Sequence, residues 1–570
     1  MSRGTLCRGL GESAAGACFR SSGLLAFFLS ALAIPLAAAA QGDRGPSLTF
    51  VRGGIVVEWD LPAEETPPFT LNGRAAARRP LGAEGSWLVE TAWAPQESYT
   101  LAWIEGGAER SLRAAAPLRP MPWRVWWIDW SADPRQRAGI SALAFAPGGR
   151  RLAIGSFDGR VRVVETATGQ TRWTLHRPGR VIKHLQFAEA GGRLYVGEQG
   201  PRGILAAYDL AGERAEPLWR FESAQELGTS QPADPQGPLG WVTYPGVYRI
   251  AARGGDVLAA FTRSWPRNGR RATLARLVRL DGATGRVRWA YPADGPATQM
   301  LTWFDVDAAG RSVVFPLQLP FGSIPRPGGG EESKVVVLDG ATGIPRFGST
   351  VAPLPPHYFA AFWRGVAFDP GGRRLAFSTE DGRGFLYIRD GETWRETRRL
   401  LLVEPMELGG VVVTATNGTL AATAAGPLFA TGETYVPLEY RSPDAEPVAE
   451  HPQSNTLFGL DWAGNTRWLW RLDADLMGLS LSADEATLAL AQGHEIGSRP
   501  RAFQGLAVLD LGRPGSGRDK LRYRYPIEGR AVYDGVAISP AGRWIALAEA
   551  PLTDRKRGLT RGAHRVHLIR

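Results

Sequence analysis

A sixteen-residue segment occurs twice in this chain of 570 residues, far apart and without a gap. AFAPGGRRLAIGSFDG (144–159) and AFDPGGRRLAFSTEDG (367–382) are identical at eleven positions. Each copy reads as strand, tight turn, strand, because the central glycines supply the backbone angles of a turn. Weaker copies lie at 304–315, 479–490 and 537–547. Self-similarity of this kind predicts an array of small β-units rather than one irregular core.

A second repeated element follows the first at a variable distance. It is clearest as VVETATGQTRW (163–173), VRLDGATGRVRW (278–289) and VVLDGATGIPRF (336–347), and degenerate at 208–219 and 460–470. A third strand ends in an acidic residue, a Thr-Gly turn reverses the chain, and a fourth strand begins near an aromatic residue. We expect the acidic side chain to accept turn amide hydrogens and the aromatic ring to pack between neighbouring sheets.

Together the two elements make a four-stranded antiparallel unit that cannot bury both of its faces alone. Radial stacking buries them, so the sequence predicts an all-β fold, an eight-bladed β-propeller with seven blades as the alternative. WRVWWIDW (123–130) alternates like a strand and is expected to complete the last blade, closing a propeller over 123–570. Insertions at 223–240 and 435–452 are expected to be surface loops. The predicted units begin near Ile140, Val181, Val247, Met300, Trp363, Gly409, Gly478 and Tyr533.

The residues before this array read as a separate small β-domain. Segments 53–61, 86–93 and 98–107 alternate apolar and polar residues between turns rich in Pro, Gly and Asn. This predicts a fibronectin- or immunoglobulin-like β-sandwich over 47–119. The prolines that follow predict a linker; they are Pro117, Pro120 and Pro122.

The first forty residues have the pattern of a secretory signal peptide. Arg3, Arg8 and Arg20 precede the apolar run 23–40, which ends in small residues before Gln41. An uncleaved membrane anchor is the alternative, since eighteen apolar residues are just long enough to span a bilayer. We expect cleavage after residue 40 and a periplasmic or extracellular, bacterial location.

Cysteine content and charge exclude several function classes. Cys7 and Cys18 are the only cysteines and both precede the expected cleavage site. The mature chain therefore has no disulfide, thiolate metal site, covalently attached haem or cysteine nucleophile. The net charge of +10 falls to about +8 without residues 1–40. Its arginines are spread over turns and strand ends, which indicates a solvated basic surface and no nucleic-acid partner.

The repeats resemble two known groups of propeller proteins. The acidic, Thr-Gly, aromatic element resembles the pyrroloquinoline-quinone-like (PQQ-like) repeat, and the strand-turn-strand element resembles WD repeats of bacterial propellers. The resemblance covers 123–570, but the propeller region has Asp129-Trp130 and Asp461-Trp462, the reverse of the WD order. The resemblance therefore identifies a superfamily and not a family. It implies a fold but no particular activity, since propellers host many activities.

The resemblance also raises a quinoprotein dehydrogenase as an enzyme hypothesis. Such enzymes hold pyrroloquinoline quinone with calcium through carboxylate and amide ligands, and many place a disulfide beside the cofactor. The mature chain has no cysteine, and none of its asparagines matches a ligand position; they are Asn72, Asn268, Asn417, Asn455 and Asn465. We therefore expect no cofactor and keep the quinone with calcium as the alternative.

Individual residues give no catalytic or metal-binding set. His564 and His567, three apart on an expected strand, point to opposite faces and cannot chelate together. His184, with Lys183 and Gln186, lies on an expected innermost strand, where it borders a central channel. Asp158-Gly159 and Asp381-Gly382 read as hairpin turns, and Asn417-Gly418-Thr419 as a glycosylation sequon only in a eukaryote. Seven tryptophans within 87–130 and the group Trp462, Trp468 and Trp470 are expected to pack between sheets.

These observations favour a secreted, non-catalytic scaffold that is a monomer with no transmembrane segment and binds a protein partner. The alternative is an enzyme with a small-molecule site at the central channel, a quinoprotein-like oxidoreductase or a lactonase or hydrolase. Carboxylates and a histidine converging at the channel mouth would favour the enzyme, and an apolar plug would favour the scaffold.

Overall fold

The computed structural model describes most of the chain after residue 45. The predicted signal peptide, the proline linker and Asp381-Gly382 lie outside the described residues. The described ranges are 46–51, 54–62, 66–75, 77–80, 84–116, 124–131, 139–211, 215–229, 243–267, 270–317, 334–348, 365–378, 383–391, 393–408, 410–435, 450–493, 503–554 and 558–570.

Two four-stranded antiparallel sheets lie in the N-terminal region. Side chains of both contribute to one buried cluster, in which Ile55 and Val57 of one sheet meet Leu101 and Trp103 of the other. A likeness to fibronectin or immunoglobulin domains stays a prediction. The strands are β1 (Ser47–Val51), β2 (Gly54–Pro62), β6 (Glu84–Val89) and β5 (Arg78–Pro80) in the first sheet, and β4 (Arg74–Ala75), β3 (Phe69–Leu71), β7 (Ser98–Glu105) and β8 (Ala108–Ala115) in the second.

The rest of the described chain forms groups of four antiparallel strands, which we call sections and number along the chain. The first four sections are β10 (Ile140–Phe145), β11 (Arg151–Ser156), β12 (Arg160–Glu165) and β13 (Thr171–His176); β14 (Val181–Phe187), β15 (Arg193–Gln199), β16 (Ile204–Asp209) and β17 (Pro217–Glu222); β18 (Gly246–Arg253), β19 (Asp256–Arg267), β20 (Arg270–Asp281) and β21 (Val287–Tyr291); and β22 (Asp305–Val306), β23 (Ser312–Leu317), β24 (Lys334–Asp339) and β25 (Pro345–Gly348). The short helix α1 (Ala224–Leu227) lies between sections 2 and 3.

The remaining sections continue this pattern. They are β26 (Val366–Phe368), β27 (Arg374–Ser378), β28 (Arg383–Asp390) and β29 (Thr393–Leu401); β31 (Val411–Ala422), β32 (Pro427–Tyr435), β33 (Thr456–Leu460) and β34 (Thr466–Arg471), with β30 (Met406–Leu408) beside β31; β35 (Asp475–Leu481), β36 (Thr487–Gly493), β37 (Gly505–Asp510) and β38 (Leu521–Pro526); and β39 (Arg530–Ile538), β40 (Ile545–Ala550), β43 (His564–Ile569) and β9 (Arg124–Ser131). The strands β41 (Leu552–Asp554) and β42 (Leu559–Arg561) form a separate hairpin.

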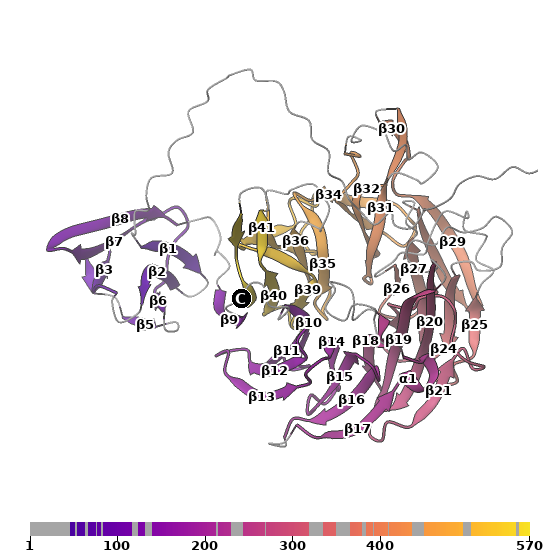
Figure 1. Cartoon of the computed structure of the whole chain (residues 1–570). Coiled ribbons are helices and arrows are strands. Elements are labelled where there is room, and N and C mark those ends of the chain that lie inside the picture. Colours follow the sequence, from indigo (N-terminus) through magenta and orange to yellow (C-terminus); the bar gives the residue numbers. More distant parts are fainter. Residues whose placement is uncertain are drawn as a thin grey trace, which may run out of the picture. The chain divides into compact units, whose positions relative to one another are not determined.

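Section 8 joins the two ends of this region. β9, which precedes section 1 in the sequence, pairs antiparallel with β43 at the C-terminus, with Ile128 opposite Val566. Figure 1 shows β9 near the marked C-terminus, and in the sheet β43 lies between β9 and β40. The predicted pairing of 123–130 with the end of the chain is therefore present.

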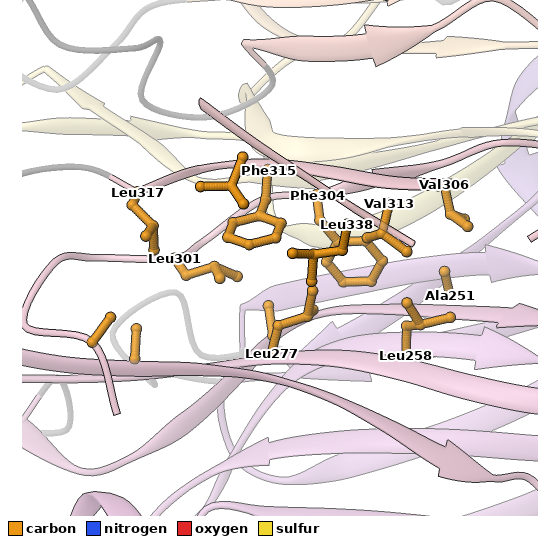
Figure 2. Packing of buried hydrophobic residues seen from close by; sticks show 14 of the residues in the cluster. Ala251, Leu258, Leu277, Leu301, Phe304, Val306, Val313, Phe315, Leu317 and Leu338 are labelled. Atoms are coloured by element: carbon orange, nitrogen blue, oxygen red, sulfur yellow. The ribbon is translucent and has the colours of Figure 1, made fainter. Parts of the chain in front are cut away.

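Buried side chains link every section to the next. The cluster between sections 3 and 4 contains Leu258 and Leu277 on one side and Phe304, Phe315 and Leu338 on the other (Figure 2). Corresponding clusters lie at each of the other junctions, including one between sections 8 and 1. The sections thus form a closed ring, the β-propeller arrangement that the sequence predicts. Sections 2 and 3 also share one bridge, Gln199 to Gly246, and the predicted count of eight blades stays a prediction.

The repeated turns form as expected from their residues. In both copies of the first element a glycine with positive φ, Gly149 or Gly372, donates its N–H three residues back, to Ala146 or Asp369. In the second element, Asp281 accepts from the Thr284 N–H at 2.8 Å and from the Thr284 hydroxyl at 3.0 Å. These bonds to Thr284 lower the pKa of the Asp281 carboxyl.

The repeat tryptophan docks onto the next section. The Trp219 Nε1–H donates to the Gly282 carbonyl at 3.1 Å, and the Trp289 Nε1–H donates to the Gly340 carbonyl at 2.9 Å. A Cβ at Gly343 would lie 2.7 Å from the Trp289 ring, so only glycine leaves room for the indole. The predicted packing of this aromatic between sheets is therefore present. The indole of each of these sections packs against the Thr-Gly turn of the next section.

The two faces of the ring carry different connections. The face where first strands turn into second strands, and third into fourth, has short links; we call it the turn face. The opposite face, the loop face, carries every connection longer than ten residues. These connections are 223–245, 292–304, 318–333, 349–365, 436–455, 494–504 and 551–563.

Candidate functional site

The first strands of all eight sections border one cavity of about 1760 Å³ along the ring axis. Among the described residues, its walls mix charged, aromatic and aliphatic side chains, and no apolar side chains plug it. One lining residue from each first strand, in chain order, is Ser141, Lys183, Arg249, Asp305, Ala367, Leu420, Met477 and Val536.

Several of these strands carry a β-bulge near their start. An extra residue interrupts the register at Ser141, Lys183, Tyr248 and Met477, and a longer irregularity separates Ala531 from Val536 in β39. A bulge leaves a residue out of the ladder and re-aims its side chain. The four bulged residues all line the cavity, so the irregularities set which side chains face it.

Among the cationic side chains that line the cavity, Lys183 has the largest change in pKa. Its ammonium nitrogen lies 4.7 Å from the centre of the Tyr248 ring, a cation–π contact between neighbouring sections. The side chain is half-buried, and desolvation lowers its pKa to about 8 against the opposing effect of Asp534. His184 and Gln186 also line the cavity, so the predicted placement of this trio on an innermost strand is confirmed.

Arg249, Trp303 and Asp305 line the cavity next to Lys183 and Tyr248. The Arg249 guanidinium stacks 3.6 Å from the centre of the Trp303 ring. Nearby, the Asp305 carboxylate accepts the Phe368 backbone N–H of the next section at 2.8 Å. Burial raises the pKa of Asp305, although this hydrogen bond and Arg249 act in the opposite direction. Asp305 therefore links two sections while facing the cavity.

Asp534 has the least ordinary backbone in this wall. Its φ is 54°, in the left-handed region that non-glycine residues seldom adopt. It lies within the irregularity of β39 and lines the cavity with Tyr533. Backbone held in this conformation concentrates at ligand-binding positions. Lysine, arginine, aromatic rings and one aspartate with positive φ line this part of the cavity.

The carboxylates at the mouths of the cavity support turns. Asp158 accepts from the Ser156 hydroxyl and the Arg160 N–H, which confirms the predicted hairpin turn at Asp158-Gly159. Asp369 pairs with Arg374 at 3.0 Å. In the part of the chain that the structure describes, no group of three or more His, Cys, Asp or Glu side chains could hold a metal ion.

His564 and His567 have separate environments, as the strand geometry predicts. His564 lines the cavity on the loop face. His567 is buried, and its Nε2 lies 2.6 Å from Glu549 Oε2. Its Nδ1 lies 3.1 Å from the Tyr525 hydroxyl. Sequence reasoning missed this network because its members come from three strands of two sections.

Replacing Lys183 by methionine should remove one pH dependence of stability. The folded-state pKa of about 8 lies below the ordinary lysine pKa of 10.5. Between these values the unfolded chain binds more protons, so stability rises with pH. The urea concentration at the midpoint of unfolding should therefore rise more for the wild type than for Lys183→Met between pH 8 and pH 10. An unchanged difference across this range would contradict the assignment.

Comparisons with known proteins agree with this architecture. A family model of PQQ-like repeats, described as outer membrane protein assembly factor BamB, matches residues 123–315, about a third of the chain. The matched part covers β9 and sections 1 to 3 and reaches into section 4. Residues 123–315 are therefore similar to the PQQ-like repeats of this family model. In the structure, the tryptophan docking described above and the pairing of β9 with β43 hold the ring together.

Solved propellers are similar at low identity. The β-propeller domain of Cps50 (Swd1) from Myceliophteria thermophila is 12% identical, with 79% of this chain and 99% of that chain covered and a TM-score of 0.39. The Dos1 propeller is 12% identical, with 79% and 94% covered and a TM-score of 0.46. The C-terminal WD40 domain of Sif2 is 12% identical, with 79% and 98% covered and a TM-score of 0.42. No curated protein matches this propeller. Among the described residues, no helix has the length and apolar character of a membrane span.

Proposed function

We propose that this propeller is a secreted, non-catalytic scaffold that binds a protein partner through its loop face. The observation that carries the proposal is the uneven distribution of connections, since every long one lies on that face. Loops held by a rigid framework are where binding residues concentrate. The ring supplies such a framework through buried clusters at every junction.

The expected location follows from the sequence and one comparison. Residues 1–40 have the pattern of a cleaved secretory leader. The matching family model is described as an outer membrane assembly factor, which fits a protein that works in the periplasm. The small β-domain proposed over 47–119 would add a second contact, and the chain would act as a monomer.

Site-specific photo-crosslinking in the producing cell tests the loop face directly. A photoreactive residue replaces Met406 or Leu559, which are exposed on that face. Matched controls replace Ala167 or Ala341, exposed in turns of the opposite face. The proposal expects one discrete adduct of the same partner from both loop-face positions and none from the controls. Adducts from the turn face alone, or no adduct from any position, would overturn it.

A second candidate function rests on the cavity. Lys183, Arg249, Tyr248 and Trp303 form a cationic and aromatic wall suited to a small anionic molecule. Titration with pyrroloquinoline quinone plus calcium, followed by melting temperature, separates the two functions because a ligand that binds the folded state raises that temperature. The scaffold proposal expects no shift. A saturable rise that Lys183→Met abolishes would favour the second candidate.

A further inference from the structure

The hairpin of β19 and β20 is longer than its counterparts. Its inner part belongs to section 3, and the strands then continue together from Arg263 opposite Leu274 to Arg267 opposite Arg270. We call residues 263–267 and 270–274 the ribbon. The corresponding hairpin of section 1 ends at Ser156 and resumes at Arg160. Because second strands end on the loop face, the ribbon extends from that face.

The base of the ribbon is braced on both sides. Arg263 donates to the Leu227 carbonyl at 2.8 Å, and Arg276 pairs with Glu226 of α1 at 2.6 Å. Ala275 and Ala297 exchange two backbone hydrogen bonds of 2.9 and 2.8 Å. Thr273 bonds Ser264 across the ribbon at 3.3 Å. These contacts fix the base, so the outer end has a defined position.

Charge along the ribbon has a single sign. From Val257 to Leu280 the chain has six arginines and no aspartate or glutamate. Arg263 and Arg276 are engaged at the base. At the outer end the register places Arg267 opposite Arg270 on one face of the ribbon, and Arg271 opposite Pro266 on the other face. Arg267 and its neighbour Pro266 are exposed.

We propose that the ribbon is a docking arm for an acidic segment of a protein partner. This inference rests on the proposed scaffold function and names the chemistry of the partner. A guanidinium binds a carboxylate through two parallel hydrogen bonds, which gives geometric selectivity as well as attraction. Arg267 and Arg270 lie opposite each other across the braced ribbon and so share one face, where they match two carboxylates of an extended chain.

The structure favours an acidic protein segment over an anionic membrane. Insertion into a bilayer needs an available aromatic or aliphatic anchor. Trp265 is the large apolar residue of the outer ribbon, and the Arg263 guanidinium covers its ring at 4.1 Å. Three arginines alone would contribute only about 1 kcal/mol each at an anionic surface.

The test measures binding of a fluorescent oligoglutamate peptide to the full mature chain at about 50 mM salt, where screening is weak. Arg267→Gln/Arg270→Gln/Arg271→Gln removes the charges of the arm. Arg395→Gln/Arg398→Gln/Arg399→Gln, three exposed positions of β29, is the matched control with the same change in net charge. The proposal expects the arm variant to bind about tenfold more weakly and the control to bind as the wild type does.

Three results would overturn the proposal: no peptide binding by the wild type, equal losses in both variants, or arm-dependent binding to phosphatidylglycerol vesicles in place of the peptide. Circular dichroism of both variants checks that each is folded. The crosslinking experiment is independent. Adducts from Met406 and Leu559 that persist in the arm variant, without peptide binding, would reject the arm and leave the scaffold standing.

Discussion

Alanine in place of Trp289 should lower the free energy of unfolding by about 3–5 kcal/mol, as expected for the loss of a buried tryptophan. The side chain is 8% exposed and packs in the cluster between sections 3 and 4. Its Nε1–H also satisfies the Gly340 carbonyl. The change would remove both the packing and the hydrogen bond that connect two sections, and urea unfolding measures the loss.

Two controls make this prediction specific. Val287→Ala alters the same strand at a side chain that is 50% exposed and should change stability by less than about 0.5 kcal/mol. Gly343→Ala should be costly because its Cβ would meet the Trp289 ring and its φ is +73°. The clash should be smaller once Trp289 is alanine, so the two substitutions should couple by about 0.5–3 kcal/mol. Additive losses would contradict the docking account.

Glu549→Ala should be the second large loss, about 2–4 kcal/mol, because it leaves the buried His567 imidazole and the Gly529 N–H without their acceptor. The side chain of Glu549 is 0% exposed and that of His567 is 4% exposed. One carboxylate oxygen accepts from His567 and the other from the Gly529 N–H at 2.5 Å. With the Tyr525 hydroxyl on its other nitrogen, the imidazole connects the closing strand to section 7.

An ion pair between Arg565 of β43 and the exposed Glu528 is the control for this network. Arg565 lies 3.4 Å from Glu528, whose side chain is 73% exposed, so Glu528→Ala should cost between 0 and about 1 kcal/mol. Glu549→Gln keeps oxygen and amide groups for hydrogen bonding and should fall between the two. Equal effects of Glu549→Ala and Glu528→Ala on the urea midpoint would show that the buried network stabilises the fold no more than the pair of Arg565 and Glu528 does.

Local repetition in the sequence predicted the fold well. Each repeat predicts two strands and a turn, and glycines such as Gly149 and Gly343 take the positive φ that those turns need. Expected unit starts at Ile140 and Val181 coincide with β10 and β14, while those near Met300 and Gly478 are a few residues from β22 and β35. Such offsets arise because turn residues are conspicuous in a sequence and strand ends are not.

The candidate site was only partly predictable. Lys183, His184 and Gln186 could be placed at the channel because their segment was expected to be an innermost strand of its unit. The bulges at Lys183 and Tyr248 were not, because a bulge is one extra residue that depends on the partner strand. Contacts between sections, such as Lys183 with Tyr248, need the ring to be known first.

Closure of the ring through β9 and β43 is the claim on which this account depends, and a designed disulfide tests it. Both native cysteines precede residue 41, so a chain begun there has a cysteine-free background. In the register of the two strands, Ile128 lies opposite Val566. Ile128→Cys with Val566→Cys should crosslink within the folded monomer under mild oxidation, and Ile128→Cys with Thr393→Cys on β29 should not. Failure of the first pair to crosslink in folded protein, or equal crosslinking of both pairs, would contradict a ring closed by these strands.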